Sequence, residues 1–215
     1  MRIIFITLIC LTALLATSVY AQTPAKPFNL YFSAGGTFPV KPDFFNDFHK
    51  LGYNLSGGLG FSALPRVQAI ARVGLHKVLK DWNSIKYADE LGNVYDDAID
   101  GGDITGVSYG VDLQLDLGLP ALPVKPYLLG GIGFMNLSEG DIKIPGANID
   151  GLSDLEFIDS GNQFYWSLGG GVLLKSGPLF SFYLEGRYTN IKQDLVQDAD
   201  LGNLIFIPIN LGIKF

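Results

Sequence analysis

Residues Ile207 to Phe215, with the sequence IPINLGIKF, alternate strictly between apolar side chains and the other residue types. One side of this stretch carries Ile207, Ile209, Leu211, Ile213 and Phe215. Successive side chains of a β-strand point to opposite faces, so a period of two indicates a strand with one apolar and one polar face. The stretch therefore predicts such a strand at the end of this sequence.

The first 21 residues have the composition of a secretory signal peptide. Met1-Arg2 gives a short basic start, residues 3–15 are apolar, and residues 19–21 resemble a cleavage site with small residues. We therefore expect residues 1–21 to be removed after export. The remaining residues, 22–215, are enough for one domain with a sizeable core.

The composition is apolar, but it contains no segment that suits a membrane-spanning helix after the predicted signal. The sequence is 48% hydrophobic, 17% charged and contains 27 glycines, yet no run of about 18 apolar residues follows the signal. This combination points to strands. Removing Arg2 from the 15 basic residues leaves 14 against 21 acidic ones, a net charge of −7 that argues against a nucleic-acid partner. The one cysteine, Cys10, lies in the predicted signal, so we expect no disulfide in the mature chain.

Eight segments have the length and the alternation of membrane-spanning strands, which need about 9–11 residues. They lie at roughly 28–39, 51–62, 66–78, 104–118, 126–137, 163–175, 180–190 and 204–215. Short turns at 63–65, 119–125 and 176–179 alternate with longer loops at 40–50, 79–103, 138–162 and 191–203. The pattern predicts an all-β fold, an eight-stranded antiparallel up-and-down transmembrane β-barrel with both termini at the periplasmic end. The run from 85 to 95 is expected to form a hairpin beyond the barrel.

Aromatic residues fall into two groups once each predicted strand is given a direction. We expect one belt near the periplasmic ends, made of Phe28, Phe61, Tyr127, Phe180 and Phe215. A second belt near the outer ends contains Phe38, Tyr53, Phe164, Trp166 and Tyr188. Amphipathic rings prefer the two membrane interfaces, which is the reason for this expectation.

The order and spacing of several segments resemble a known family. They are residues 31–38 (YFSAGGTF), 51–61 (LGYNLSGGLGF), 126–134 (PYLLGGIGF), 182–188 (FYLEGRY) and the terminal Phe215. With these segments the chain resembles the eight-stranded outer-membrane protein A/X-type β-barrels, the broad outer membrane protein beta-barrel domain group. The resemblance implies a place in the bacterial outer membrane and contact with its lipids and lipopolysaccharide. It also implies that the barrel-assembly machinery recognises Phe215 as a C-terminal assembly signal.

One residue departs from the expected pattern. Pro208 lies within the last predicted strand but has no backbone N–H, and a closed barrel has no edge strand where that donor would be dispensable. The proline indicates either a bulge or a late start of the last strand.

The same alternation places polar side chains inside the barrel. The third predicted strand contributes Gln68, Arg72 and His76, the fourth Asp112, Gln114 and Asp116, and the seventh Glu185 and Arg187. Opposite charges should pair there, because an unpaired buried charge is strongly destabilising. We predict a lumen polar network of Arg72, Asp112, Gln114, Asp116, Glu185 and Arg187. It suits either a gated polar pathway or a salt-bridged plug in an interior just wide enough for side chains, and we favour the plug.

The glycine clusters and the acidic loop do not match known ligand motifs. No helix is predicted to follow the cluster at 57–60, and the sequence contains no Walker pattern, so we assign the glycines to relief of crowding in a narrow barrel. In the loop at 79–103, part of a calcium-loop spacing is present, but position 98 is alanine and the closing glutamate is missing. We therefore expect neither a metal nor a cofactor.

We expect a monomeric outer-membrane barrel with a structural or surface-interaction role. A small-solute pore and a lipid-modifying enzyme are the alternatives. Such an enzyme needs a nucleophile and a base at the outer-leaflet face. After the signal the sequence has only His49 and His76, and His76 points inward by parity. We therefore expect no catalytic residues.

Overall fold

The computed structural model of the chain describes residues 28–42, 51–80, 87–88, 94–95, 100–118, 124–140, 142–143, 161–177, 179–192 and 203–215. The predicted signal peptide, His49 and most of the four predicted loops lie outside these residues. Within the described residues, no helix is long and apolar enough to cross a membrane.

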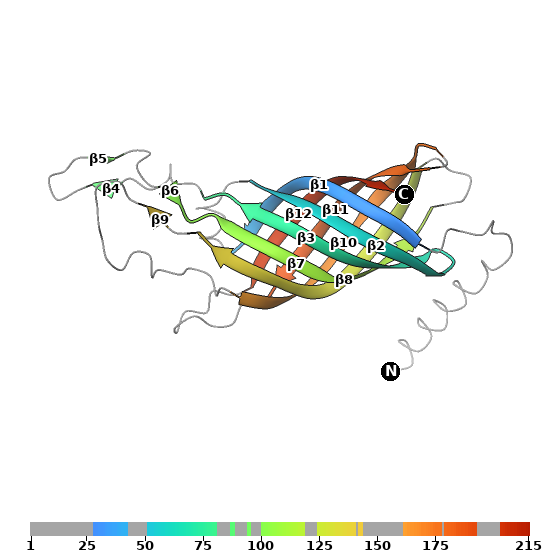
Figure 1. The fold of residues 1–215 in the computed structure, drawn as a ribbon, viewed down its shortest axis with the longest axis horizontal. Coiled ribbons are helices and arrows are strands. Elements are labelled where there is room, and N and C mark those ends of the chain that lie inside the picture. The colour runs from blue at the N-terminus through green and yellow to red at the C-terminus, as the bar shows by residue number, and fades with distance from the viewer. Residues whose placement is uncertain are drawn as a thin grey trace.

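Eight long strands form a closed barrel in which every strand pairs antiparallel with both neighbours (Figure 1). They are β1 (Phe28–Lys41), β2 (Gly52–Leu64), β3 (Val67–Val78), β7 (Ile104–Asp116), β8 (Val124–Glu139), β10 (Gly161–Lys175), β11 (Ser181–Ile191) and β12 (Leu204–Lys214). Consecutive long strands are neighbours, and β12 closes the ring against β1. The predicted fold class is confirmed. We call the end where β1 begins and β12 ends the terminus end, and the opposite end the loop end.

Every boundary of the eight strands lies within two residues of the predicted one. The largest difference is at β8, which is two residues longer at each end than the predicted strand at 126–137. Its ends pair through the backbone, with Val124 opposite Leu174 and Glu139 opposite Ile104. Ladder hydrogen bonds do not require apolar side chains, so a strand can continue past the end of an apolar pattern.

Four short strands lie beyond the loop end (Figure 1). β4 (Tyr87–Ala88) pairs with β5 (Val94–Tyr95), as the predicted hairpin within 85–95 requires. β6 (Asp100–Gly101) pairs with β9 (Ile142–Lys143). The β6–β9 pair joins the segment just before β7 to the segment just after β8. The parts of the chain that pair as β7 and β8 in the barrel therefore pair again beyond it.

The barrel closes through β1 and β12, and Pro208 lies inside this seam. β12 begins at Leu204, so the proline does not delay the strand, and it stands opposite Thr37 in a regular register. The register shift lies on β1 between Pro39 and Lys41. The predicted late start is therefore wrong, and the bulge lies in the partner strand, two residues from the position opposite Pro208.

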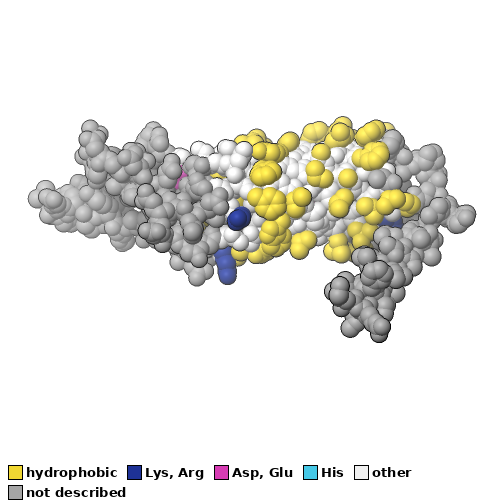
Figure 2. All heavy atoms as spheres, turned by 90° about the horizontal axis from the view of Figure 1, so that it is seen from below, with side chains coloured by type: hydrophobic (Ala, Val, Ile, Leu, Met, Phe, Trp, Pro, Cys, Tyr) yellow, Lys and Arg dark blue, Asp and Glu magenta, His cyan; other side chains and the backbone are white. Residues whose placement is uncertain are grey.

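The two faces of the wall differ sharply in polarity. On β7, Leu113 is 60% exposed, whereas its neighbours Asp112 and Gln114 are buried at 1% and 2% exposure. The same alternation runs around the ring, and Figure 2 shows a broad band of hydrophobic side chains on the outer surface. Because hydrocarbon surrounds a membrane barrel, the outer face can be apolar while the polar side chains face the lumen.

Outward-facing aromatic rings gather near both ends of the barrel. At the terminus end Phe28 packs on Phe61, and Phe180 packs on Phe215, with ring centroids 5.5 and 6.4 Å apart. Toward the loop end Trp166 packs on Tyr188 at 5.6 Å. The expectation for Tyr127 is wrong, because this residue faces the lumen at 3% exposure. It occupies the inward phase of β8, next to the outward-facing Leu128.

Candidate functional site in the barrel interior

Four charged side chains from three strands meet inside the barrel and form what we call the charged cluster. Asp112 of β7 accepts two hydrogen bonds from Arg187 of β11, from Nη1 at 3.0 Å and from Nη2 at 2.8 Å. Asp112 also accepts a bond from Arg72 Nε of β3 at 2.8 Å. Glu185 of β11 accepts a bond from Arg187 Nε at 2.7 Å and lies 3.5 Å from Arg72 Nη1. These contacts link both carboxylates to both guanidinium groups.

The charged cluster spans the lumen. In the ring, β7 and β11 are separated by β8 and β10, so the two-bond contact between Arg187 and Asp112 joins strands that are not neighbours. The two residues are 75 positions apart in the sequence. A planar guanidinium matches the two oxygens of a carboxylate, which makes this contact strong and directional.

The charges in the cluster balance, and the hydroxyl of Tyr127 adds one hydrogen bond to it. Two guanidinium groups face two carboxylates, and all four side chains are at most 9% exposed. Tyr127 Oη donates a hydrogen bond to Glu185 Oε2 at 2.9 Å. A buried ion pair is tolerated only when its partners are close and its remaining donors and acceptors are satisfied. Each carboxylate therefore depends on both guanidinium groups, and each guanidinium group on both carboxylates.

Two of the predicted network residues lie elsewhere. Gln114 Nε2 donates to Asp116 Oδ1 at 2.7 Å, nearer the terminus end of β7 than Asp112. At the same end Tyr31 Oη and Lys214 Nζ both donate to Gln68 Oε1, the second at 3.1 Å. The structure thus divides the predicted set into the charged cluster and a separate polar group at the terminus end.

Apolar side chains lie on both sides of the charged cluster. Along β3 the inward side chains run from Ile70 through Arg72 to Val78, and β11 carries its charged pair between Tyr183 and Ile191. On the terminus side Tyr31, Ile70 and Tyr183 pack together, with Leu173 against them. On the loop side a larger cluster, the loop-end apolar layer, consists of Val78, Ile104, Met135, Leu137, Tyr165, Ile191, Leu204 and Phe206.

Sequence reasoning did not identify these apolar layers or the inward tyrosines. The signal that could have found them is the alternation along β8 and β12. Tyr127 lies on the same inward face of β8 as Met135, and Phe206 lies on the same inward face of β12 as Asn210. Parity alone does not show that the inward apolar side chains of different strands stand at one depth. That depth depends on the stagger of the strands around the ring.

His76 faces the lumen, as parity predicts, and contacts a serine. Its Nε2 lies 3.1 Å from Ser108 Oγ, and Ser108 Oγ also donates to the backbone oxygen of Gly74 at 3.4 Å. The pair borders an interior cavity of about 40 Å³. Among the described residues, no group of three or more His, Cys, Asp or Glu side chains is arranged to hold a metal ion.

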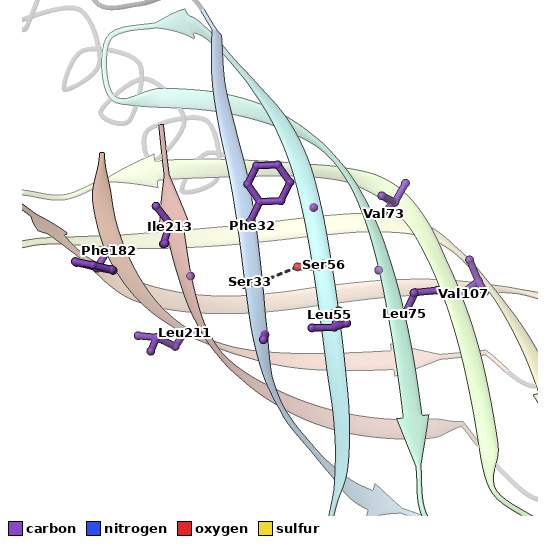
Figure 3. A pocket seen from close by; sticks show the side chains of 14 residues that line it. Phe32, Ser33, Leu55, Ser56, Val73, Leu75, Val107, Phe182, Leu211 and Ile213 are labelled. Atoms are coloured by element: carbon purple, nitrogen blue, oxygen red, sulfur yellow. Dashed lines mark hydrogen bonds between the residues drawn. The ribbon is translucent and has the colours of Figure 1, made fainter. Parts of the chain in front are cut away.

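A shallow depression of about 850 Å³ lies on the outer wall over β12, β1, β2 and β3 (Figure 3). Small residues, Ala34 and Gly57, lie among larger outward side chains. The larger ones include Phe32, Leu55, Val73, Leu75, Leu211 and Ile213. The depression belongs to the apolar outer face and is separate from the polar interior.

Comparison with known proteins shows the same architecture. The crystal structure of Neisserial surface protein A has 16% sequence identity and a TM-score of 0.59, over 89% of this chain and 98% of that one. OprG from Pseudomonas aeruginosa has 13% identity and a TM-score of 0.49, over 88% and 97% of the two chains. The outer membrane enzyme PagL has 13% identity and a TM-score of 0.44, over 87% and 98%. No curated protein sequence matches the chain. At 16% identity the similarity to Neisserial surface protein A shows a shared fold and assigns no activity.

The family assignment comes from the sequence itself. Residues 7–215 match the outer membrane protein beta-barrel domain, which is nearly the whole chain. The closed ring of eight antiparallel strands with an apolar outer face agrees with this match. The chain therefore belongs to the outer membrane protein beta-barrel domain family and is a protein of the outer membrane.

Proposed function

We propose that this barrel has a structural or surface-interaction role and that its lumen is closed by a salt-bridged plug. The charged cluster is the observation that supports the proposal, because its contacts cross the lumen from β11 to β7 and to β3 and its four side chains are almost fully buried. Apolar side chains on both sides of the cluster add two barriers to ions. An interior of eight strands is narrow enough for side chains alone to fill it.

Single-channel recording in planar bilayers tests the plug. We expect the purified protein to give no stable conductance. Arg187→Ala should also be silent, because the apolar layers on both sides remain. If the charged cluster were a gate in an otherwise open pathway, Arg187→Ala would produce channels. Stable channels from the unaltered protein would support the small-solute pore instead.

We propose no enzymatic activity. The pair of His76 and Ser108 has the distance of a base and a nucleophile. However, it borders a cavity of about 40 Å³ in the barrel interior, and ligand pockets usually measure about 300–1,000 Å³. A membrane lipid does not fit there. Mass spectrometry of lipids from cells with and without the gene should show identical profiles, and a changed acylation pattern would support the enzyme.

We propose that lipids and lipopolysaccharide are the main partners of the outer wall. Lys41 and Lys192 are exposed and flank the start of β12 at the loop end. Figure 2 shows basic side chains beside the edge of the apolar band. Replacing both lysines with glutamate should weaken retention of lipopolysaccharide during purification. Replacing Arg66, an exposed residue between β2 and β3 at the terminus end, with glutamate is the control and should leave retention unchanged.

A further inference from the structure

Two outward positions within the depression on the outer wall carry almost no side chain. Ala34 of β1 is paired with Leu55 of β2 on one side and with Leu211 of β12 on the other. Gly57 is the next outward position after Leu55 along β2. Larger side chains of four neighbouring strands stand around the two positions (Figure 3): Phe32, Leu55, Val73 and Leu211. Ala34 and Gly57 therefore leave a hollow among taller apolar side chains.

The depression runs obliquely across the wall and begins near the terminus end. On β11 and β12 it is lined by Phe182 and Ile213, each the second residue from the terminus end of its strand. On β3 and β7 it is lined by Leu75 and Val107, each the fourth residue from the loop end. Phe182 also packs on Phe180 of the aromatic belt at the terminus end, with ring centroids 5.4 Å apart. The depression thus starts beside the belt that we expect at the periplasmic side of the membrane.

The lining of the depression suits a purely apolar ligand. Ser33 and Ser56 are the only lining residues with a polar side chain. Their hydroxyl groups lie 2.7 Å apart and bond to each other, as the dashed line in Figure 3 shows. The other lining side chains offer a ligand only apolar contact.

We propose that the depression binds one acyl chain of a glycerophospholipid from the periplasmic leaflet, and that this lipid is retained while its neighbours exchange. The proposal rests on the proposed lipid contact of the outer wall and gives it a place and a lipid class. Its volume of about 850 Å³ lies in the range of about 300–1,000 Å³ that is usual for ligand pockets.

Shape is the reason for retention. A chain that lies on a convex wall touches protein on one side only, whereas a chain in the hollow touches the floor at Gly57 and the taller side chains beside it. Each added contact contributes a small dispersion attraction, and an unfilled hollow would forfeit these contacts. Because hydrocarbon surrounds this part of the wall, an acyl chain reaches the hollow without crossing water.

A second copy of the barrel fits the depression less well than an acyl chain. Two cylinders meet along a narrow line, and a stable protein interface buries about 800 Å² on each partner. The taller side chains around Ala34 and Gly57 would also keep a convex wall away from the floor. A chain of lipopolysaccharide would come from the other leaflet, whereas the depression begins beside the belt at the terminus end.

Native mass spectrometry of the protein in mild detergent tests the proposal. The probes are palmitoyl-oleoyl-phosphatidylethanolamine and lipid A, added together and then depleted by detergent exchange. We expect the unaltered protein to retain one phosphatidylethanolamine. Gly57→Leu fills the hollow and should lose this lipid, and its Cβ has room because the nearest heavy atom lies 3.8 Å away. Gly186→Leu is the matched control and should keep the lipid, since this glycine of β11 lies outside the depression and no heavy atom is within 4 Å of its Cβ position.

Four results of this measurement would overturn the proposal. Equal retention by the two variants would mean that the depression holds no particular lipid. Retention of lipid A instead of phosphatidylethanolamine would assign the site to the other leaflet, and a dimer that Gly57→Leu dissociates would assign it to a second copy. Absence of lipid from all three proteins would overturn it together with the proposed lipid contact of the outer wall.

Crystals of the unaltered protein give a second measurement that does not depend on how the variants fold. They are grown with phosphatidylethanolamine that carries bromine on one acyl chain. We expect an anomalous bromine peak in van der Waals contact with Leu55 and Leu211, and none beside Gly186. Peaks spread evenly over the apolar band, or no peak in the depression, would contradict an ordered chain.

Discussion

Arg187 is central to the charged cluster, because it donates two hydrogen bonds to Asp112 and one to Glu185. Its neighbour on the outer face, Tyr188, is 38% exposed, so adjacent positions on one strand lie in opposite environments. Replacing a buried charged side chain such as Arg187 leaves its partners buried and unpaired. This lowers stability more than the loss of the contacts themselves.

We predict that Arg187→Ala lowers the free energy of unfolding by about 3–5 kcal/mol, because it leaves Asp112 and Glu185 with one guanidinium between them. Urea titration in lipid vesicles is the measurement. The double variant Arg187→Leu with Asp112→Leu restores the charge balance and should be destabilised less than the sum of the two single variants. Additive losses would show that the two side chains do not act as a unit.

Gly133 is a position where the narrow lumen leaves no room for a side chain. A Cβ there would lie 2.7 Å from Gly110 Cα and 2.8 Å from Tyr165 Cε1. Gly133→Ala should therefore destabilise the barrel by about 1–3 kcal/mol through overpacking. Gly186→Ala is the matched control, because no heavy atom lies within 4 Å of its Cβ position. Equal unfolding midpoints for the two variants would contradict this account.

The difference between the two faces extends along whole strands. On β7 the outward side chains form a lipid face and the inward ones a lumen face. Leu113→Arg places a charge on the lipid face near mid-membrane, where it costs about 2–4 kcal/mol. Gln114→Arg places the same side chain inside, beside Asp116, and should be destabilised less. We expect a clearly lower urea midpoint for Leu113→Arg in vesicles. Indistinguishable midpoints would mean that the two faces are assigned wrongly.

β12 is the strand that closes the ring, and its last contacts come from Phe215. Phe215 N donates to Leu30 O at 2.9 Å, and Leu30 N donates to Phe215 O at 3.3 Å. Its ring packs against Phe32 and Phe180. Deleting Phe215 removes both the ring and the two backbone bonds, whereas Phe215→Ala removes only the ring.

We predict that deleting Phe215 lowers the amount of assembled protein in the outer membrane while export continues. An unclosed seam leaves N–H and C=O groups without partners in lipid. Cell fractionation, combined with protease access to the loop at 79–103, measures the effect. If the ring is the assembly signal, Phe215→Ala should show the same loss. If the truncated protein reaches normal abundance and its 79–103 loop is fully accessible to protease, Phe215 has no role in assembly beyond that of a lipid-facing side chain.

The closed ring has no free edge, and this governs the stability of the whole molecule. Each of the eight long strands pairs with a neighbour on both sides, so the ring has no free edge strand from which unfolding can start. We predict that the folded protein resists SDS at room temperature and changes its apparent size on boiling. Electrophoresis of membrane-extracted protein before and after heating is the measurement. Identical mobility would be incompatible with a closed barrel in detergent.

The sequence by itself determined the strands and their two faces. Alternation is a local property, since side chains at positions i and i+2 share a face whatever the rest of the chain does. For this reason Leu113, Asp112 and Gln114 were placed correctly, and every strand boundary lay within two residues. The aromatic-belt expectation fails at Tyr127 because depth alone does not decide the face, and this residue occupies the inward phase of β8.

Only the tertiary structure decided which inward side chains meet. Arg187 reaches Asp112 across 75 positions, while Gln114, two residues from Asp112 on the same face, belongs to a different group. The depth of each side chain in the lumen depends on strand stagger and on closure of the ring, and both are properties of all eight strands together. The charged cluster and the apolar layers on either side of it follow from that shared geometry, which no single segment encodes.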